Sequence, residues 1–443
     1  MALFGTNGIR GDAASLFTDQ FCFDIGQAFS QFLQTKKLAK KVIVFGMDSR
    51  TSSSRIKSAV TSGLGQEWDI WDEGIIPTPA LNYFIKQHDC AGIMVTGSHI
   101  EKNLNGLKFF VGLEEITKQD ETVIEKLYFQ IKQQTRYQPQ KRLIKKEANA
   151  RQVYTQMLVK LARSDFQGWQ VAVDPGNGTQ SEIIPDVLRK LQIQVLAINA
   201  DPTKPLLSRD TEIQDAFPKL RQAVFDQQAN LGIGYDSDGD RAIFIDDTGQ
   251  PLTGETSCSI IAQYSPDPTI VTPINTSTVV EKIGKKVIRT KVGVLYVVAA
   301  MKKHGTNVGF ESNGGFVSGE IFYGRDAGTA TIKMLNLLKK TGKKLSELTA
   351  ALPKYYIIKD KVDCPSKIND QILAAAVKKY QGKKIEDQDG VKIWIDPNSW
   401  ILFRPSGNAP EFRVFAESLD QAKTQQLAQA GMALVKSVLQ SAW

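Results

Sequence analysis

Short apolar runs alternate with longer amphipathic stretches along most of the chain, and this alternation limits the possible folds more than any other feature. Runs typical of buried strands lie at 42–46, 92–96, 170–173, 194–198, 231–234 and 307–310. Stretches typical of helices lie near 55–64, 149–163, 181–191, 214–228, 294–304 and 327–340. Continuous apolar strands separated by helices form largely parallel sheets that are covered on both faces. The pattern therefore predicts an α/β protein.

The alternation restarts along the chain, and 443 residues are too many for one ordinary core. We expect three α/β domains with mixed or parallel sheets and a smaller C-terminal α+β domain. Segments 355–363, 393–395 and 400–403 indicate antiparallel strands in that last domain, and a closing helix is expected over 418–439. The expected domains span 1–147, 148–249, 250–353 and 354–443.

Composition excludes several classes of protein. Hydrophobic residues make up 42% of the chain and charged residues 23%, which is ordinary globular usage. No apolar run is long enough to cross a bilayer, and the first residues do not resemble a secretory signal, so we expect a cytoplasmic protein without a membrane partner. The four cysteines are far apart and form no CxxC pair, which favours reduced thiols over a zinc site.

A net charge of +8 suits either a nucleic-acid partner or a dianionic small substrate. Small lysine clusters, such as Lys339 with Lys340, lie near expected helix ends, where they complement the helix dipole. No zinc-finger, RNA-binding or basic heptad signature is present. We therefore expect no nucleic-acid partner.

The first candidate motif is the loop at 96–99, which follows a short apolar strand. Ligands bind beyond the carboxyl ends of such strands. Ser98 between Gly97 and His99 is expected to be sterically open, with a proton acceptor beside it. Lys108 lies a little downstream, where it could reach a phosphate or shuttle a proton. The hydrolase motif G-x-S-x-G is absent, because Ile100 occupies the last position. Taken alone, the loop is more simply a polar turn.

The second motif is the strongest. Asp236, Asp238 and Asp240 alternate directly after an apolar strand, and Arg241 follows them. Three neighbouring carboxylates repel one another unless a cation joins them, and Mg²⁺ prefers such oxygen ligands. An EF-hand calcium loop is excluded, because Arg241 stands where that loop needs glycine. An exposed acidic turn is disfavoured, because the apolar strand at 242–245 predicts a buried hairpin. Neutralising Asp238 is expected to relieve repulsion in the metal-free protein.

Two further loops follow apolar strands. The segment 404–413 places two arginines around a Ser-Gly-Asn turn, a combination of forked donors and backbone amides that is typical of a phosphate site. The segment 309–315 places Glu311, Ser312 and Asn313 before two glycines, which suits recognition of sugar hydroxyls. Taken alone, each loop is more simply a surface turn.

Taken together and in this order, the motifs resemble the α-D-phosphohexomutase superfamily, which contains phosphoglucomutases and phosphomannomutases. The resemblance covers the whole chain and includes 4–11, 96–99, 236–241, 289–293, 311–315 and 404–413. It implies four domains that each contribute one loop to a central cleft. The implied reaction interconverts hexose 1-phosphate and hexose 6-phosphate through a phosphoserine enzyme and a hexose 1,6-bisphosphate, which is both intermediate and activator.

The resemblance also implies roles for individual residues. Ser98 is the expected phosphoserine, and with Asp236, Asp238 and Asp240 it would hold one Mg²⁺ per chain. The other expected catalytic residues are Arg10, His99, Lys108 and Arg241. The expected substrate-binding residues are Lys291, Glu311, Ser312, Asn313, Arg404, Ser406, Gly407, Asn408 and Arg413.

The chain departs from the family pattern in two places. Its serine loop reads Thr-Gly-Ser-His-Ile-Glu instead of S-A-S-H-N-P, and Asn408 replaces the usual threonine. The first change leaves open how the serine loop is held. The combination is similar to a bacterial phosphomannomutase branch, so mannose phosphate is the expected substrate and glucose phosphate a second. The alternatives are a metal-dependent sugar phosphatase and a non-catalytic phosphosugar-binding protein. We expect phosphosugar ligands and a monomer or homodimer.

Overall fold

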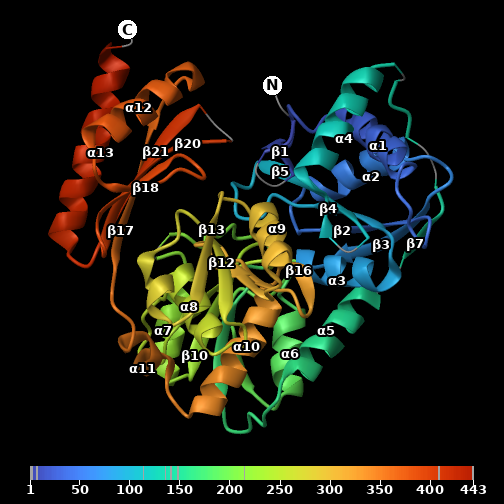
Figure 1. Ribbon diagram of the computed structural model, residues 1–443. Coiled ribbons are helices and arrows are strands. Elements are labelled where there is room, and N and C mark those ends of the chain that lie inside the picture. Colours follow the sequence, from blue (N-terminus) through green and yellow to red (C-terminus); the bar gives the residue numbers. More distant parts are fainter. Residues whose placement is uncertain are drawn as a thin grey trace.

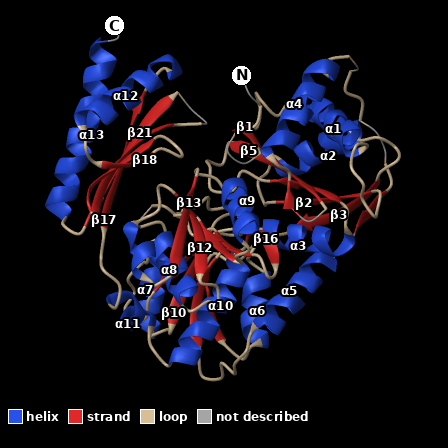
Figure 2. Ribbon diagram, in the orientation of Figure 1, coloured by secondary structure: helices blue, strands red, loops and turns tan. Residues whose placement is uncertain are grey.

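The computed structural model describes residues 3–5, 8–112, 114–134, 136–139, 142–146, 149–213, 215–407 and 410–441. Within these residues the strands form four sheets, arranged with the first and the last on opposite sides above a central pair (Figure 1). Helices cover both faces of the first three sheets, whereas α12 and α13 lie along one side of the last (Figure 2). The prediction of three α/β domains followed by an α+β domain is confirmed.

The first sheet mixes parallel and antiparallel strands in the order β1-β5-β4-β2-β3-β7, with β6 beside β5. Its elements are β1 (Ile9–Asp12), α1 (Asp19–Leu33), β2 (Val42–Met47), α2 (Ser53–Gly63), β3 (Asp69–Ile75), α3 (Thr78–His88), β4 (Ala91–Val95), β5 (Leu104–Val111), β6 (Glu114–Glu115), α4 (Lys118–Ile131) and β7 (Ile144–Lys146). Along β2, Ile43 and Phe45 pack with α1, α2 and α4, while Val44 packs with α3. This alternation follows from the two-residue period of a strand.

The second sheet has the order β11-β10-β8-β9. Its segment contains α5 (Asn149–Leu161), β8 (Gln170–Asp174), α6 (Ile183–Lys190), β9 (Gln194–Ala197), α7 (Pro218–Gln227), β10 (Leu231–Tyr235) and β11 (Ala242–Ile245). β8 is parallel to both β9 and β10, and β10 and β11 form the predicted buried antiparallel hairpin. The loop of that hairpin carries the three aspartates.

The third sheet has the order β13-β12-β14-β15-β16. Its segment contains α8 (Gly254–Gln263), β12 (Thr269–Pro273), the 3-10 helix η1 (Thr278–Lys282), β13 (Lys286–Thr290), α9 (Val294–His304), β14 (Val308–Phe310), β15 (Phe316–Ser318), β16 (Phe322–Arg325), α10 (Ala327–Thr341) and α11 (Leu345–Ala350). One continuous hydrophobic core joins the second and third sheets, since Ile233 of β10, Ile270 of β12 and Leu335 of α10 belong to the same cluster.

The last sheet is antiparallel throughout, in the order β17-β21-β20-β19-β18. Its segment contains β17 (Tyr356–Asp363), the 3-10 helix η2 (Ser366–Ile368), α12 (Asn369–Lys379), β18 (Lys384–Glu386), β19 (Val391–Asp396), β20 (Ser399–Pro405), β21 (Glu411–Ser418) and α13 (Gln421–Ser441). Trp400 and Leu402 of its other face pack with Ile274 and Val292 of the third segment. The closing helix begins three residues later than expected, because Ser418 still pairs in β21 with Tyr356.

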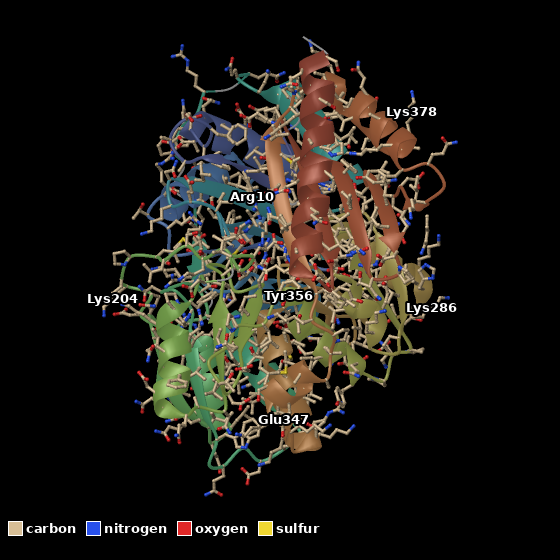
Figure 3. All side chains as sticks on the ribbon, turned by 90° about the vertical axis from the view of Figure 1, so that its left-hand side faces the viewer. Arg10, Lys204, Lys286, Glu347, Tyr356 and Lys378 are labelled. Carbon is tan, nitrogen blue, oxygen red and sulfur yellow. The ribbon has the colours of Figure 1, made fainter. Side chains whose placement is uncertain are left out.

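The positions of the lysines and cysteines agree with what the composition predicted. In Figure 3 the labelled lysines Lys204, Lys286 and Lys378 lie at the periphery, and all three are exposed. The four cysteines are buried and unpaired. Among the described residues, no helix is long and apolar enough to cross a membrane.

Candidate active site

The loop after β4 places Ser98 inside the molecule. Its side chain is 0% exposed, and its φ of +51° lies in the left-handed region that few non-glycine residues adopt. The Oγ donates to Asp236 Oδ2 at 2.8 Å and lies 3.4 Å from His99 Nδ1. The expectation of a sterically open serine is wrong, because the aspartate hairpin of the second sheet closes over the hydroxyl.

Two residues that follow β2 hold this loop in shape. Asp48 Oδ2 accepts hydrogen bonds from Thr96 Oγ1 at 2.8 Å and from the Gly97 amide at 3.1 Å. Arg50 pairs with Asp48 at 3.1 Å and donates to a run of backbone carbonyls, those of Ser98, Ile100, Glu101 and Leu104, at 2.5–3.0 Å. Both side chains are almost completely buried. The serine loop, which lacks the family's Asn-Pro pair, is thus held by Asp48 and Arg50.

The aspartate loop brings its three carboxylates together. Candidate ligand oxygens of Asp236, Asp238 and Asp240 lie within 4.8 Å of one another, and all three residues are buried. The β10–β11 hairpin forces this proximity, since the three residues occupy its tight turn. Asp236 Oδ1 accepts hydrogen bonds from the backbone amides of Asp240 and Arg241 at 3.2 and 3.1 Å. The loop geometry is therefore fixed by its own backbone.

Cationic side chains from two other sheets compensate this negative charge. Lys108 of β5 is 2% exposed, and its Nζ lies 2.7 Å from Asp238 Oδ2 and 2.9 Å from Asp240 Oδ2. Arg325, at the end of β16, donates to Asp240 Oδ2 at 2.8 Å. Thr78 Oγ1 adds a hydrogen bond to Asp238 Oδ2 at 2.7 Å. The cluster therefore joins the first three domains.

Two carboxylate oxygens of the cluster remain available to coordinate a metal ion. Asp238 Oδ1 and Asp240 Oδ1 are buried and make no hydrogen bond among the described residues. Asp236 Oδ2 holds the Ser98 hydroxyl instead. Buried carboxylate oxygens without hydrogen-bond partners are costly, and converging hard oxygen donors suit Mg²⁺. The residues present therefore fit a divalent cation bound between the three aspartates, next to Ser98.

The carboxylates of this cluster differ in acidity. Burial and the neighbouring Asp238 and Asp240 raise the pKa of Asp236 well above its usual value. Burial also opposes ionisation of Asp238, but Lys108, Thr78 and Arg325 together outweigh it and hold the pKa of Asp238 below its usual value. Arg325 in the same way lowers the pKa of Asp240 against the effect of burial. Asp238 repels Asp236 and Asp240 as expected, but neutralising it would also remove its ion pair with Lys108, so Asp236 is the strained charge of the cluster.

The remaining expected catalytic residues surround the same point. Arg241 Nε lies 3.7 Å from Asp240 Oδ1, and this arginine lowers the pKa of His99, with further contributions from burial and Arg10. Arg10 lies on β1 opposite Gly106, and burial together with Arg241 lowers its pKa to about 10. His99 is consequently kept neutral, because a positive charge on its ring would be repelled by these arginines.

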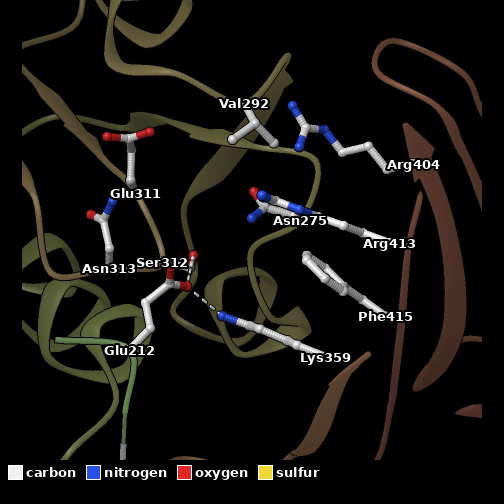
Figure 4. A pocket seen from close by; sticks show the side chains of 10 residues that line it. All are labelled: Glu212, Asn275, Val292, Glu311, Ser312, Asn313, Lys359, Arg404, Arg413 and Phe415. Carbon is white, nitrogen blue, oxygen red and sulfur yellow. Dashed lines mark hydrogen bonds and ion pairs between the residues drawn. The ribbon is translucent and has the colours of Figure 1, made fainter. Parts of the chain in front are cut away.

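A second group of predicted residues lines a pocket beside this cluster (Figure 4). Five of the expected substrate-binding residues contribute, namely Glu311, Ser312, Asn313, Arg404 and Arg413. Glu311 Oε2 accepts a hydrogen bond at 3.0 Å from Arg325, the arginine that also binds Asp240. Arg325 therefore connects the pocket directly to the aspartate cluster.

The two arginines of the pocket belong to neighbouring strands. Arg404 of β20 lies opposite Arg413 of β21 in the sheet register, so both side chains are on one face. Each has an acidic neighbour: Arg404 Nε lies 2.7 Å from Asp389 Oδ2, and Arg413 donates to Glu411 Oε1 at 2.6 and 2.9 Å. Two forked donors on one face can bind a phosphate from two directions.

Some predicted residues do not join this pocket. Lys291 is exposed and is absent from the lining, as is exposed Gly407. Ser406 also lies outside the lining, and its amide donates to the Glu411 carbonyl at 2.9 Å. Asn408 lies outside the described residues.

Several residues of the candidate site were not predicted from the sequence. Asp48 and Arg50 could have been found from the acidic and basic residues directly after a buried strand. Arg325 ends a strand in the same way. Glu212 and Lys359 also line the pocket, but they belong to no local motif, and only the packing of separate domains brings them there.

Comparison with known proteins agrees with this geometry. Residues 1–135, 151–249 and 253–356 match the family descriptions "Phosphoglucomutase/phosphomannomutase, alpha/beta/alpha domain I", "domain II" and "domain III", respectively. A "Phosphoglucomutase/phosphomannomutase" of Thermococcus kodakarensis is 32% identical, over 99% of both chains. A "Probable phosphoglucosamine mutase" of Methanocella arvoryzae is 31% identical, over 100% of this chain and 99% of the relative.

Solved structures share the fold. A phosphoglucomutase/phosphomannomutase family protein of Burkholderia thailandensis has a TM-score of 0.83 at 20% identity, covering 99% of this chain and 97% of that one. An N-acetylphosphoglucosamine mutase of Aspergillus fumigatus, solved with GlcNAc-6P and magnesium, has a TM-score of 0.63 at 13% identity, covering 98% and 96%. With its matched domains and its full-length relatives, the chain belongs to the phosphoglucomutase/phosphomannomutase family of α-D-phosphohexomutases.

Proposed function

We propose that this phosphohexomutase interconverts hexose 1-phosphate and hexose 6-phosphate through a phosphoserine at Ser98, with mannose phosphates as main substrates and glucose phosphates also accepted. One observation carries the proposal. The Ser98 hydroxyl lies on a buried three-carboxylate cluster that Arg325 joins to a pocket containing two arginines and a glutamate. A nucleophile, a cation site and a phosphate-binding face are thus adjacent.

Asp236, Asp238, Asp240 and a phosphoserine oxygen would hold Mg²⁺, the ion present in the Aspergillus relative. The bound ion would withdraw charge from the phosphoryl oxygens and stabilise the charge that develops during transfer. Lys108 stays protonated next to two of these aspartates, since they raise its pKa against the effect of burial. It therefore acts as a fixed positive charge within the aspartate cluster, not as a base.

The chain's own residues position the substrate. Arg404 and Arg413 would bind the phosphate that does not react, while Glu311 and Ser312 would accept and donate hydrogen bonds to sugar hydroxyls. This places the free hydroxyl of the sugar at the phosphoserine. As its oxygen bonds to phosphorus, the bond from phosphorus to Ser98 Oγ breaks, and the hydroxyl proton passes to the departing Ser98 Oγ, which lies 3.4 Å from His99 Nδ1.

Transfer leaves a hexose 1,6-bisphosphate and a free serine. The bisphosphate then turns over, its other phosphate meets Ser98, and the reverse transfer gives the isomer. The two arginines recognise only a phosphate, so they can bind either end of the intermediate. We assign the four loops to domains spanning 1–147, 148–249, 250–353 and 354–443, each contributing one part of the site.

The decisive experiment measures products. Purified protein with Mg²⁺ is incubated separately with mannose, glucose and glucosamine 1-phosphates, and 6-phosphate isomers and inorganic phosphate are both quantified. We expect isomer without net phosphate release. Free phosphate would favour the sugar phosphatase, and binding without any product would favour a non-catalytic phosphosugar-binding protein.

A further inference from the structure

Glu212 and Lys359 form a charged pair inside the substrate pocket. Lys359 Nζ lies 2.6 Å from Glu212 Oε1, and the same oxygen accepts a hydrogen bond from Ser312 Oγ at 3.2 Å (Figure 4). Glu212 comes from the segment between β9 and α7, Lys359 from β17, and Ser312 from the loop after β14. Three domains therefore meet at one carboxylate oxygen.

The sheet register separates this pair from the arginines. Lys359 lies opposite Phe415, and Phe415 is two residues from Arg413 on β21, so the three side chains share one face. The Lys359 Nζ lies 5.9 Å from the centre of the Phe415 ring, and in Figure 4 this ring stands between Lys359 and Arg413. The pocket thus has a phosphate end with two arginines and a separate end with Lys359, Glu212 and Ser312.

The second end of the pocket is suited to binding the substituents of a sugar ring. Its serine belongs to the loop assigned above to sugar hydroxyls, and the Lys359 and Glu212 side chains are 28% and 38% exposed, so a ligand can reach both. Glu311, the other carboxylate of the pocket, is already bound by Arg325. A ligand at this end therefore meets one exposed charged pair, a donating ammonium beside an accepting carboxylate.

Hydroxyl and amino substituents interact differently with such a pair. A hydroxyl can donate to Glu212 and accept from Lys359 at the same time. A protonated amine can only donate, and it brings a positive charge next to Lys359. We propose that Lys359 and Glu212 determine substrate class, selecting hexose phosphates over hexosamine phosphates; this rests on the proposed mutase function.

The test compares two variants with opposite expectations. Lys359→Met removes the repelling charge and leaves Glu212 to attract an amine, so the kcat/KM ratio of glucose 1-phosphate to glucosamine 1-phosphate should fall about fivefold, the effect of one exposed charge pair. Glu212→Gln leaves Lys359 without its counter-charge, so the ratio should rise by about the same factor. General damage to the pocket would lower both rates together and leave the ratio unchanged.

Lys361→Met is the matched control. Lys361 lies on the same strand two residues away and pairs with Glu411 at 3.0 Å, outside the pocket lining. Its removal should leave the ratio unchanged. The inference is overturned if both pocket variants shift the ratio in the same direction, or if neither differs from the control.

Calorimetric binding separates this inference from the proposed function. Glucose 6-phosphate and glucosamine 6-phosphate are titrated into each protein without turnover, and the ratio of the two Kd values should shift as the kinetic ratio does. If the wild-type protein bound both sugars but converted neither, the mutase proposal would fail. The Kd ratios of the variants would still test whether Lys359 and Glu212 discriminate between the two sugars. Equal Kd ratios in all variants would reject the pair, whatever the turnover.

Discussion

Replacing Arg50 with methionine tests whether this buried arginine holds the serine loop. Methionine keeps most of the side-chain length but removes every donor, so the contacts to Asp48 and to four backbone carbonyls are lost. Removing one partner of a buried ion pair costs about 3–5 kcal/mol, and each orphaned buried carbonyl adds about 1–3 kcal/mol. Because the carbonyls belong to a loop that can move toward water, we expect the unfolding free energy to fall by about 4 kcal/mol.

The effect on catalysis should be larger than a loss of stability alone explains. Arg50 contacts the Ser98 carbonyl, and Ser98 adopts an unfavourable left-handed conformation. Without this contact the hydroxyl should leave its position on Asp236, and misplacement by about 1 Å lowers rates by roughly 100-fold. Urea unfolding gives the stability change, and turnover at a temperature where the variant remains folded gives the rate.

Two controls separate the mechanism from general damage. Arg55→Met removes an arginine that is 43% exposed and paired with Asp19, so its unfolding free energy should change by less than about 0.5 kcal/mol. Adding Asp48→Asn to Arg50→Met removes the unpaired buried carboxylate, which should restore part of the stability but none of the rate. If Arg50→Met behaved like Arg55→Met in both assays, the assignment of Arg50 as the support of the loop would be refuted.

Further predictions concern the cluster and the pocket. Ser98→Ala should retain stability within about 1 kcal/mol but abolish turnover, and intact mass should show one phosphate on some wild-type molecules and none on the variant. Near-wild-type turnover would exclude the phosphoserine. Chelation of metal should abolish turnover, and in metal-free buffer at neutral pH, Asp236→Asn should raise the unfolding free energy and Asp238→Asn should lower it, each by about 1–3 kcal/mol. The sign follows from the pKa shifts: above the unfolded-state pKa of about 3.9, a charge with a raised folded pKa costs stability, and one with a lowered pKa adds it. Equal changes of the unfolding free energy in the two variants would contradict this difference between Asp236 and Asp238. Arg413→Ala should lower kcat/KM by one to a few tenfold steps, about 1.4 kcal/mol each, equally for mannose and glucose 1-phosphates, whereas Glu311→Gln should change their ratio. A strong change of preference in Arg413→Ala alone would mean that the two loops are assigned the wrong way round.

Much of the fold follows from local patterns in the sequence. The expected helix at 294–304 coincides with α9, and the apolar strand at 242–245 coincides with β11. These segments were predictable because periodicity and turn residues depend on short stretches of chain. The aspartate motif was predictable for the same reason, since three alternating carboxylates in a hairpin turn must lie close together.

The contacts between domains could not be predicted in this way. Lys108 looked like a residue near a phosphate, yet its position in the structure is inside a salt bridge with two aspartates 130 and 132 residues away. The burial of Ser98 also depends on a hairpin from another sheet. Such pairings arise from the packing of whole domains, and no local spacing encodes them.

The continuous hydrophobic cluster shared by the second and third sheets has a consequence for how the molecule can move and unfold. Separating these two parts would expose the apolar side chains that meet between them, so residues 151–353 should behave as one rigid, cooperatively folding body. The C-terminal sheet has a core of its own, and the first segment is built mainly on separate clusters. Because Lys108 and Ser98 also tie the first segment to the aspartates, any opening of the site should fall mainly to the C-terminal part, while the aspartates and Glu311 keep a constant spacing on the central body.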